Sequence, residues 1–341
     1  MNAKMKQKNV LVTGGAGFIG ANLVRMLLEH DYAVTVLDNL SVIPPKYLAG
    51  LPIRFVEGDI LDSELLNQLI PGHNMVVHLA AQSGVPASLA NPRQDCEINV
   101  IGTLNMLEAS RHADVKRFIF ASSNAPLGRQ PPPATEDNAP LPISPYGASK
   151  LAGEAYCLAY HGSWGLGTVV LRFANIYGPF SAHKNSVVAK FIKHILANGQ
   201  ITIDGDGAQT RDFIYVKDLC RAILLALESD VGGELFQIAT GVETSILQLA
   251  ALVQQVMGRD VKIQHGHPRR GDIRKNYSDI SKVERMLNWR PETDLLKGLQ
   301  QTIESFWESS VTAITPRSHS CQLKESNHTR RTCPHPQPLS Q

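Results

Sequence analysis

The sequence predicts an α/β protein in which a doubly wound parallel sheet is joined to a smaller C-terminal domain. Two observations predict this class. Short apolar runs alternate with helical patterns over the first 175 residues, and a glycine-rich turn follows the first run. The runs are continuously apolar, which is typical of strands covered on both faces, and repeated strand–helix units imply right-handed crossovers. The 341 residues are enough for one large or two medium domains.

Strands and helices are expected in regular alternation. The expected strands are Asn9–Thr13, Ala33–Leu37, Ile53–Val56, Met75–Leu79, Arg117–Ala121 and Thr168–Arg172. The expected helices are Gly20–His30, Pro92–His112, Pro145–His161, Ser186–Ala197, Ile246–Met257 and Ser281–Leu287. Seven prolines from Asn124 to Pro145 exclude helix and inner strand there, and they indicate a long functional loop.

Composition and charge exclude several classes of protein. Lys and Arg number 33 against 31 for Asp and Glu, which gives a net charge of +2. This small charge does not indicate binding to nucleic acid or to an anionic membrane. No apolar run approaches the roughly 20 residues that a membrane helix needs. The five cysteines are scattered and form no C-x-x-C pair, so neither a disulfide framework nor a metal site is predicted. We therefore expect a cytoplasmic protein that binds neither nucleic acid nor membranes.

A glycine-rich turn joins the first expected strand to the first expected helix. Glycines at 14, 17 and 20 allow a tight turn, close approach of the backbone to a pyrophosphate, and close packing of helix on sheet. The helix N-terminus then offers free amides to the phosphates. Asp38 ends the next strand, near the position of a carboxylate that binds the adenosine ribose. An acid there repels a 2′-phosphate, so the pattern predicts NAD in preference to NADP.

A second motif lies at the start of the helix that follows the proline-rich loop. Ser144 suits the N-cap and Pro145 the first helical position, so Tyr146 and Lys150 become i and i+4 neighbours on one face. An ammonium about 5 Å from a phenol, at an effective dielectric near 20, stabilises phenolate by roughly 3 kcal/mol. That energy corresponds to a fall of about two units in the phenol pKa. We therefore expect Tyr146 to exchange a proton near neutral pH.

Several further stretches resemble a single family. They are Gly58–Ile60, His78–Ala81, Asn99–Thr103, Leu171–Pro179, Arg211–Asp218 and Arg269–Asp272. With the two motifs above, the chain resembles the extended short-chain dehydrogenase/reductase family, in its nucleotide-sugar epimerase/dehydratase branch, over about residues 8 to 310. The resemblance implies a Rossmann sheet with a smaller C-terminal substrate-binding domain, NAD as cofactor and a nucleotide-diphosphate sugar, expected to be a UDP-sugar, as substrate.

The resemblance also implies roles for individual residues. The catalytic set is Asn99, Ser123, Tyr146 and Lys150. NAD is expected to contact Gly14, Gly17, Phe18, Ile19, Gly20, Asp38, Asn39, Asp59, Ile60, Leu79, Ala80, Ala81, Tyr146 and Lys150. The substrate is expected to contact Ser123, Asn124, Asn175, Arg211, Arg269, Asp272 and Asn276. The competing interpretation of Arg211 and Asp212 is a surface ion pair.

The residues after Ser123 favour one reaction. Related dehydratases carry Asp-Glu directly after the catalytic hydroxyl, whereas this chain has Asn124 and Ala125 and no carboxylate before Glu136. The sequence therefore predicts NAD-dependent 4-epimerisation through a 4-keto sugar. The alternatives are a nucleotide-sugar 4,6-dehydratase, a 4-reductase and, from another class, an NAD-sensing regulator without chemistry.

The sugar is left open by the sequence. The family's usual Val-Tyr-Gly is Pro126-Leu127-Gly128 here, and Asn276 stands where some glucose-specific epimerases have a bulky Tyr. A smaller residue leaves more room around the hexose. UDP-glucose or UDP-galactose, a UDP-N-acetylhexosamine and UDP-glucuronate are all candidates.

The resemblance divides the chain into two domains and a tail. Residues 8–177, with a returning segment near 211–245, form the expected NAD-binding domain, and 178–310 form the expected substrate domain. Residues 316–341 are polar, lack apolar periodicity and are expected to be disordered.

The resemblance further implies a homodimer that pairs two helices of each copy. These helices are Pro92–His112 and Pro145–His161, with Met106, Leu158 and Tyr160 expected on their outer faces.

Other reactive side chains are interpreted as structural. His265 and His267 lack partners for a metal site and indicate a surface turn. Cys157 indicates buried packing, and His78 is expected to support the cofactor site.

Overall fold

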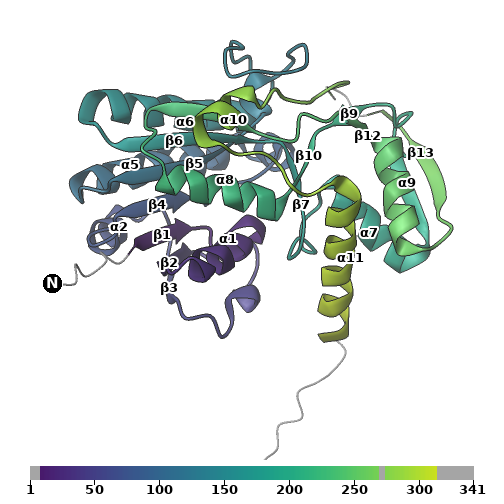
Figure 1. Ribbon diagram of the computed structural model, residues 1–341, viewed down its shortest axis with the longest axis horizontal. Helices are drawn as coiled ribbons and strands as arrows, with labels where there is room; N and C mark the ends of the chain where they lie inside the picture. The colour runs from purple at the N-terminus through teal and green to yellow at the C-terminus, as the bar shows by residue number, and fades with distance from the viewer. Residues whose placement is uncertain (1–7, 269–272, 313–341) are drawn as a thin grey trace, which may run out of the picture.

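A seven-stranded parallel sheet organises the computed structural model, which describes residues 8–268 and 273–312. Its strands are β1 (Asn9–Thr13), β2 (Ala33–Asp38), β3 (Arg54–Glu57), β4 (Met75–His78), β5 (Arg117–Ser123), β6 (Gly167–Phe173) and β11 (Glu234–Ile238). Their order across the sheet is β11-β6-β5-β4-β1-β2-β3, and every pair is parallel (Figure 1). The strand order reverses between β1 and β4, which is where ligands bind in open α/β sheets. The predicted fold class is confirmed.

The two faces of the sheet are each covered by helices. One face packs on α1 (Phe18–Glu29), α8 (Val216–Glu228) and α10 (Ser281–Leu287), and the other on α2 (Ser63–Leu69), α5 (Gly102–His112) and α6 (Pro145–Trp164). Successive residues of β1 point to opposite faces: Val10 and Val12 join the first core and Leu11 joins the second. All three are fully buried, which explains why the strand is continuously apolar.

A second group of elements surrounds its own core on the right of Figure 1. It contains β7 (Asn175–Tyr177), α7 (Val187–Asn198), β8 (Gln200–Asp204), β10 (Phe213–Tyr215), α9 (Ile246–Met257), β13 (Lys262–Gly266) and α11 (Leu295–Thr312). Parallel pairs β8–β13 and β7–β10 and an antiparallel pair of β9 (Thr210–Arg211) with β12 (Thr244–Ser245) connect it. The chain passes to this group, returns to the sheet at α8 and β11, and leaves again at β12. The expected domain limits stay a prediction.

The segment Pro92–His112 is helical throughout, as predicted, but it is not a regular α-helix. It consists of α4 (Pro92–Cys96), a π-helical turn η2 (Glu97–Ile101) and α5. π-helical turns inside helices occur frequently at functional sites, because they rotate the following side chains relative to the regular spiral. Of the side chains expected on the outer faces, Leu158 is exposed, but Met106 and Tyr160 are buried.

The proline-rich loop is irregular except for one short turn. The turn is a 3-10 helix, η3 (Ala125–Leu127), which contains Pro126 and corrects the expectation of no helix. Isolated bridges Gly128↔Leu141 and Ala134↔Ser278 hold the rest of the loop against itself and against a distant segment. The remaining short elements are η1 (Lys46–Leu48) and α3 (Val85–Ala90).

Some predictions concern parts of the chain that the structure does not describe. Arg269, Asp272 and the tail over 316–341 lie outside the described residues. Within residues 8–268 and 273–312, no helix is both long and apolar enough to cross a bilayer. His265 lies on strand β13 and is exposed, so the expected surface turn is a surface strand.

Candidate active site

The glycine-rich turn between β1 and α1 leaves no room for side chains at two positions. Gly14 has a φ of +68°, and a Cβ there would lie 2.8 Å from the backbone nitrogen of Ala80. A Cβ on Gly20 would lie 2.4 Å from the carbonyl oxygen of Gly14. Both glycines are therefore required for the backbone to turn this tightly and to lie directly against the segment after β4.

The first turn of α1 presents unpaired amides beside this loop. Its N-cap is Gly17, which has no side chain to accept from them, and the first turn, which contains Phe18 and Ile19, carries no acidic residue. The uncapped amides and the helix dipole favour a bound anion. Asp38 lies next to the turn, where its carboxylate accepts from the backbone nitrogens of Ala16 and Leu40, both at 2.9 Å.

The remaining residues expected at the cofactor lie along the same edge of the sheet. The Asn39 amide donates to the carboxylate of Asp59 at 2.8 Å. Leu79 and Ala80 follow β4, and their backbone nitrogens donate to Thr13 at 3.2 Å each. Ala81 continues this segment. Ile60 differs, because its side chain is 5% exposed and belongs to the core shared by α2 and α5.

The end of β5 and the start of α6 bring the predicted Ser, Tyr and Lys together. Ser144 caps α6 by accepting from the Gly147 nitrogen at 3.1 Å, and Pro145 is the first helical residue, as predicted. The Ser123 hydroxyl is hydrogen-bonded to the phenol of Tyr146. The Lys150 ammonium donates to the Ala121 carbonyl of β5 at 2.9 Å.

Burial has the largest effect on the pKa values of Tyr146 and Lys150. The expected lowering of the Tyr146 pKa is therefore wrong for the protein without its cofactor. Tyr146 is partly exposed, but burial of its phenol raises the pKa to about 12. The hydrogen bond with Ser123 acts in the opposite direction and lowers the pKa. Burial also lowers the pKa of Lys150 to about 8, with Asp95, Cys157 and Glu154 opposing that shift. Desolvation of both groups outweighs the attraction between the ammonium and the phenolate.

Asn99 occupies the π-helical turn and is buried behind α6. Its side-chain oxygen accepts from the Gln82 nitrogen at 2.9 Å. Its amide donates to Asp95 at 3.0 Å, and to the Ser149 hydroxyl and the Gln82 carbonyl at 3.1 Å each. Asp95 and Ser149 are missed by the sequence reasoning. The signal for Asp95 is its position one helical turn before Asn99.

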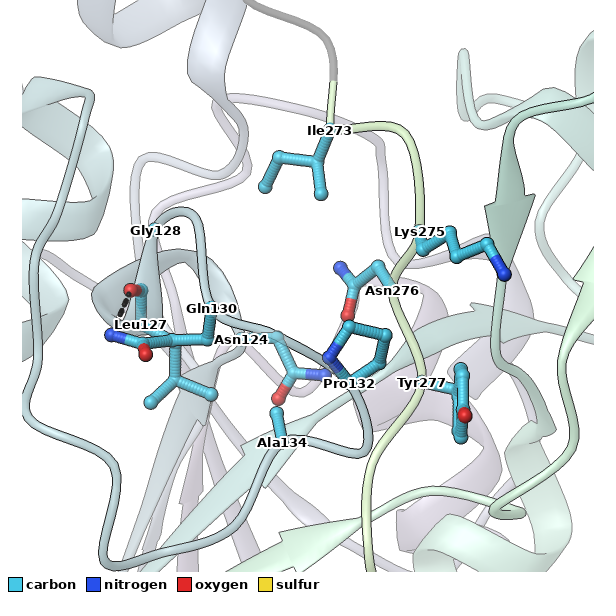
Figure 2. A pocket seen from close by; sticks show the side chains of 10 residues that line it. All are labelled: Asn124, Leu127, Gly128, Gln130, Pro132, Ala134, Ile273, Lys275, Asn276 and Tyr277. Carbon is cyan, nitrogen blue, oxygen red and sulfur yellow. Dashed lines mark hydrogen bonds between the residues drawn. The ribbon is translucent and has the colours of Figure 1, made fainter.

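A small pocket, lined from Asn124 onward, brings together two of the residues expected at the substrate. The loop over 124–134 forms one side and the segment over 273–277 forms the other, with the side chain of Asn276 pointing toward the loop (Figure 2). Asn124 donates to the Ser278 hydroxyl at 3.1 Å, while its buried oxygen has no hydrogen-bond partner among the described residues. That oxygen is an available acceptor next to the predicted catalytic hydroxyl.

The other expected substrate residues lie on the elements between the sheet and the second core. Asn175 begins β7, and Arg211 on β9 donates to the carbonyls of Thr210 and Ile273. The interpretation of Arg211 and Asp212 as a surface ion pair is wrong. Asp212 is fully buried, and its carboxylate accepts from Thr240 and from the nitrogen of Gly241.

Two buried groups next to the site have structural partners. His78 is 1% exposed and lies between the hydroxyls of Thr13 and Thr103, at 2.8 and 3.1 Å. Burial lowers its pKa to about 3, so the imidazole is neutral. Burial raises the pKa of the Cys157 thiol. The thiol therefore stays protonated at neutral pH and is not a nucleophile, and both ring nitrogens of His78 are engaged by hydroxyl groups. Among the described residues, no cluster of His, Cys, Asp and Glu could hold a metal ion.

The parallel sheet, the glycine turn at its switch point and the Ser–Tyr–Lys constellation define an extended short-chain dehydrogenase/reductase. The model of the NAD dependent epimerase/dehydratase family matches residues 10–239, and the chain belongs to this family.

Several known proteins are similar to most of the chain. A UDP-glucose 4-epimerase from Mycolicibacterium smegmatis is 37% identical over 309 residues, which cover 88% of this chain and 99% of that relative. A solved UDP-glucose 4-epimerase from Thermotoga maritima, with UDP-glucose, is 39% identical with a TM-score of 0.85 and covers 89% of this chain and 99% of its own. A dTDP-glucose 4,6-dehydratase from Streptomyces venezuelae, solved with NAD, is 33% identical with a TM-score of 0.84, over 89% and 98%.

NAD is the cofactor, and the glycine turn has the shape and chemistry that such a group requires. The backbone at Gly14 and Gly20 is free of Cβ atoms, the α1 amides are uncapped and the Asp38 carboxylate retains lone pairs for hydroxyl groups. Relatives that catalyse different reactions share this fold and NAD site. The residues after Ser123 are therefore the part of the site that distinguishes the reactions.

Proposed function

We propose that this protein is an isomerase, an NAD-dependent nucleotide-sugar 4-epimerase that acts on a UDP-sugar. The observation that carries the proposal is the lack of a carboxylate in the segment from Ser123 to Thr135. Asn124 and Ala125 follow the hydroxyl, and the next acid in the chain, Glu136, accepts from the backbone nitrogen of Gln237 in β11 at 2.8 Å. Elimination of water from a 4-keto sugar needs an acid–base group near carbons 5 and 6, and Glu136 is bound elsewhere.

In this proposal the protein residues move one proton and hold one oxygen. Tyr146 takes the proton of the sugar's 4-hydroxyl, Ser123 hydrogen-bonds the same oxygen, and Lys150 supports the phenolate from within α6. NAD supplies the hydride acceptor and, when reduced, the hydride donor. The 4-keto sugar rotates before its carbon is reduced from the other face, and Tyr146 returns the proton. Asn99 fixes the start of α6 through Ser149.

The substrate contacts proposed are those of the resemblance. Asn124 and Asn276 would line the hexose pocket, and Asn175 and Arg211 would bind the nucleotide diphosphate, since a guanidinium matches phosphate oxygens. Arg269 and Asp272 are proposed for the same role. The small Asn276 side chain leaves UDP-glucose, UDP-N-acetylglucosamine and UDP-glucuronate as candidate substrates.

Two other enzymatic reactions would use the same frame. A 4,6-dehydratase is disfavoured by the residues after Ser123. A 4-reductase would release its cofactor and change the oxidation state of the sugar, whereas an epimerase does neither. A regulator that only senses NAD has no need for Ser123, Tyr146 and Lys150 together.

One experiment separates these reactions. Purified protein is incubated with each of the three UDP-sugars, and the products are followed by NMR. Epimerisation yields the 4-epimer with no net change in NADH absorbance. A 4-keto-6-deoxy product would indicate a dehydratase, and stoichiometric NADH would indicate a dehydrogenase or reductase. No conversion of any of the three would contradict the proposed function.

We also propose that the protein forms a homodimer through the helices α5 and α6. Leu158 and Tyr156 on α6 are each 39% exposed, and Trp164 is 54% exposed. Apolar side chains on one helix are the usual core of such an interface. Light scattering coupled to size-exclusion chromatography measures the mass, and a Leu158→Glu variant should be monomeric. A wild-type mass of one chain would contradict the dimer.

A further inference from the structure

A buried carboxylate lies behind the catalytic helix and has no assigned role. Asp95 is 1% exposed and belongs to α4, which packs directly on α6. One carboxylate oxygen accepts from Asn99, while the other is buried and has no hydrogen-bond partner among the described residues. Burying a charge in this way is costly, so its position calls for a compensating function.

A chain of hydrogen bonds connects Asp95 to the backbone of the proposed base. Asp95 accepts from the Asn99 amide at 3.0 Å, and that amide also donates to the Ser149 hydroxyl at 3.1 Å. Ser149 in turn donates to the carbonyl of Tyr146 at 3.1 Å. The carboxylate therefore orients an amide that touches the first turn of α6, where the phenol must meet the sugar oxygen.

The electrostatic environment of Lys150 singles out the same carboxylate. Three groups of the described chain favour its charged form, in the order Asp95, Cys157 and Glu154. The Cys157 thiol is neutral because burial raises its pKa. Glu154 is already paired with the Arg172 guanidinium through two hydrogen bonds, at 2.7 and 2.8 Å. His78, on the other side, is neutral.

Asp95 is thus the carboxylate near Lys150 that forms no ion pair within residues 8–268 and 273–312. In a site of low dielectric, an unscreened charge of this kind acts strongly on its neighbours. It favours the ammonium of Lys150 and disfavours the phenolate of Tyr146, whose pKa is raised mainly by burial and further by Asp95.

Resting on the proposed function, we propose that Asp95 is a positioning residue for the reaction. Its carboxylate places a negative charge behind the turn of α6 that carries Tyr146 and Lys150 and, through Asn99 and Ser149, holds that turn in place.

The variant Asp95→Asn tests the charge alone, because its amide oxygen can still accept from Asn99. Lysine labelled with ¹³C at Cε reports the titration of Lys150 in the NAD-loaded protein, with Lys150→Arg assigning the signal. We expect the Lys150 pKa to fall by about one unit. The alkaline limb of the pH profile of kcat should move to lower pH by the same amount. Above the wild-type Lys150 pKa, this shift corresponds to about a 10-fold loss of turnover.

Two further variants provide controls. Glu97→Gln removes an exposed acid two residues away and should leave both the lysine titration and the pH profile unchanged. Asp95→Glu restores the charge and should recover the Lys150 titration. A Lys150 signal that titrates in Asp95→Asn as in the wild type would overturn the inference. The Lys150 signal is measured without substrate. Failure of this inference can therefore be distinguished from failure of the proposed function, which would show as a wild-type protein that epimerises no UDP-sugar.

Discussion

The carboxylate of Glu136 accepts a hydrogen bond from the backbone nitrogen of Gln237, at a distance of 2.8 Å. Gln237 belongs to β11, the edge strand of the sheet, so this contact satisfies an amide that has no neighbouring strand. The contact also binds the first acid after Ser123 in the chain to the sheet edge. Neither of the two residues that follow Ser123, Asn124 and Ala125, supplies a carboxylate in its place.

Placing acids beside Ser123 should therefore open a second reaction. The double variant Asn124→Asp, Ala125→Glu supplies the acid–base pair that elimination requires. We expect a minor 4-keto-6-deoxy product, which NMR and absorbance in alkali detect, together with reduced epimerisation. The single variant Glu136→Ala is the control, and it should lose only the stability of one hydrogen bond, about 1–2 kcal/mol. If the double variant forms no such product, other differences in the pocket exclude elimination.

Removal of the Tyr146 hydroxyl should stop turnover without releasing the cofactor. Proton transfer by a positioned side chain contributes a factor of about 10² to 10⁴, so Tyr146→Phe should lose at least this much in kcat. NAD content, measured after denaturation of the purified protein, should stay at the wild-type level. Tyr156→Phe changes an exposed tyrosine of the same helix and should retain full activity. Wild-type turnover in Tyr146→Phe would assign the base elsewhere.

The glycine turn should tolerate no side chain at position 20. In Gly20→Ala, the new Cβ would lie 2.4 Å from the Gly14 carbonyl oxygen, so the loop must shift. We expect a loss of about 1–3 kcal/mol in stability and weaker retention of NAD. Gly162→Ala is the matched control, because this exposed helical glycine has nothing within 4 Å of its Cβ position. It should gain roughly 0.5–1 kcal/mol. Equal NAD content in both variants would contradict the assignment of the glycine turn as the NAD-binding site.

Acid should destabilise the protein partly through His78. Its pKa is lowered from 6.5 to about 3 by burial, so between these values the unfolded chain binds more protons than the folded one. The free energy of unfolding then falls as pH falls through this window, by up to about 1.4 kcal/mol per pH unit for this one group.

Urea unfolding at pH 7.5 and pH 5 measures this effect. His73 and His183 also have lowered pKa values and contribute in the same direction, so the test is a difference in slope. His78→Gln should be less stable at both pH values but depend less on pH. The exposed His267→Gln should keep the wild-type pH dependence. An unchanged slope in His78→Gln would show that His78 does not bind the extra proton on unfolding.

Much of the sheet could be predicted because the signal lies within each strand. A run such as Val10–Val12 is apolar at every position, and a strand covered on both faces requires that pattern. β11 carries a weaker signal, since Glu234 and Gln237 interrupt its apolar residues. Helix α11 is likewise absent from the expected elements. The π-helical turn at Glu97–Ile101 gives no signal in the periodicity, because one altered turn barely changes the spacing of apolar residues.

The protonation of the candidate site could not be predicted in the same way. From the spacing of Tyr146 and Lys150 one expects a lowered phenol pKa, and the structure shows a raised one. The difference comes from desolvation, which depends on everything packed around the phenol. Arg211 and Asp212 provide a second example, since these neighbours in sequence face different surroundings.

The order of residues along the chain determined the phosphate-binding turn and the Tyr146–Lys150 spacing, because each depends on backbone geometry over a few residues. It also fixes directly that no acid follows Ser123 at the next two positions. Only the tertiary structure decided that the Asp95 carboxylate is buried against Asn99, that Glu136 is bound to β11 at the edge of the sheet, and that Asp212 is buried. These facts depend on which distant segments exclude water from one another, and no local pattern records that choice.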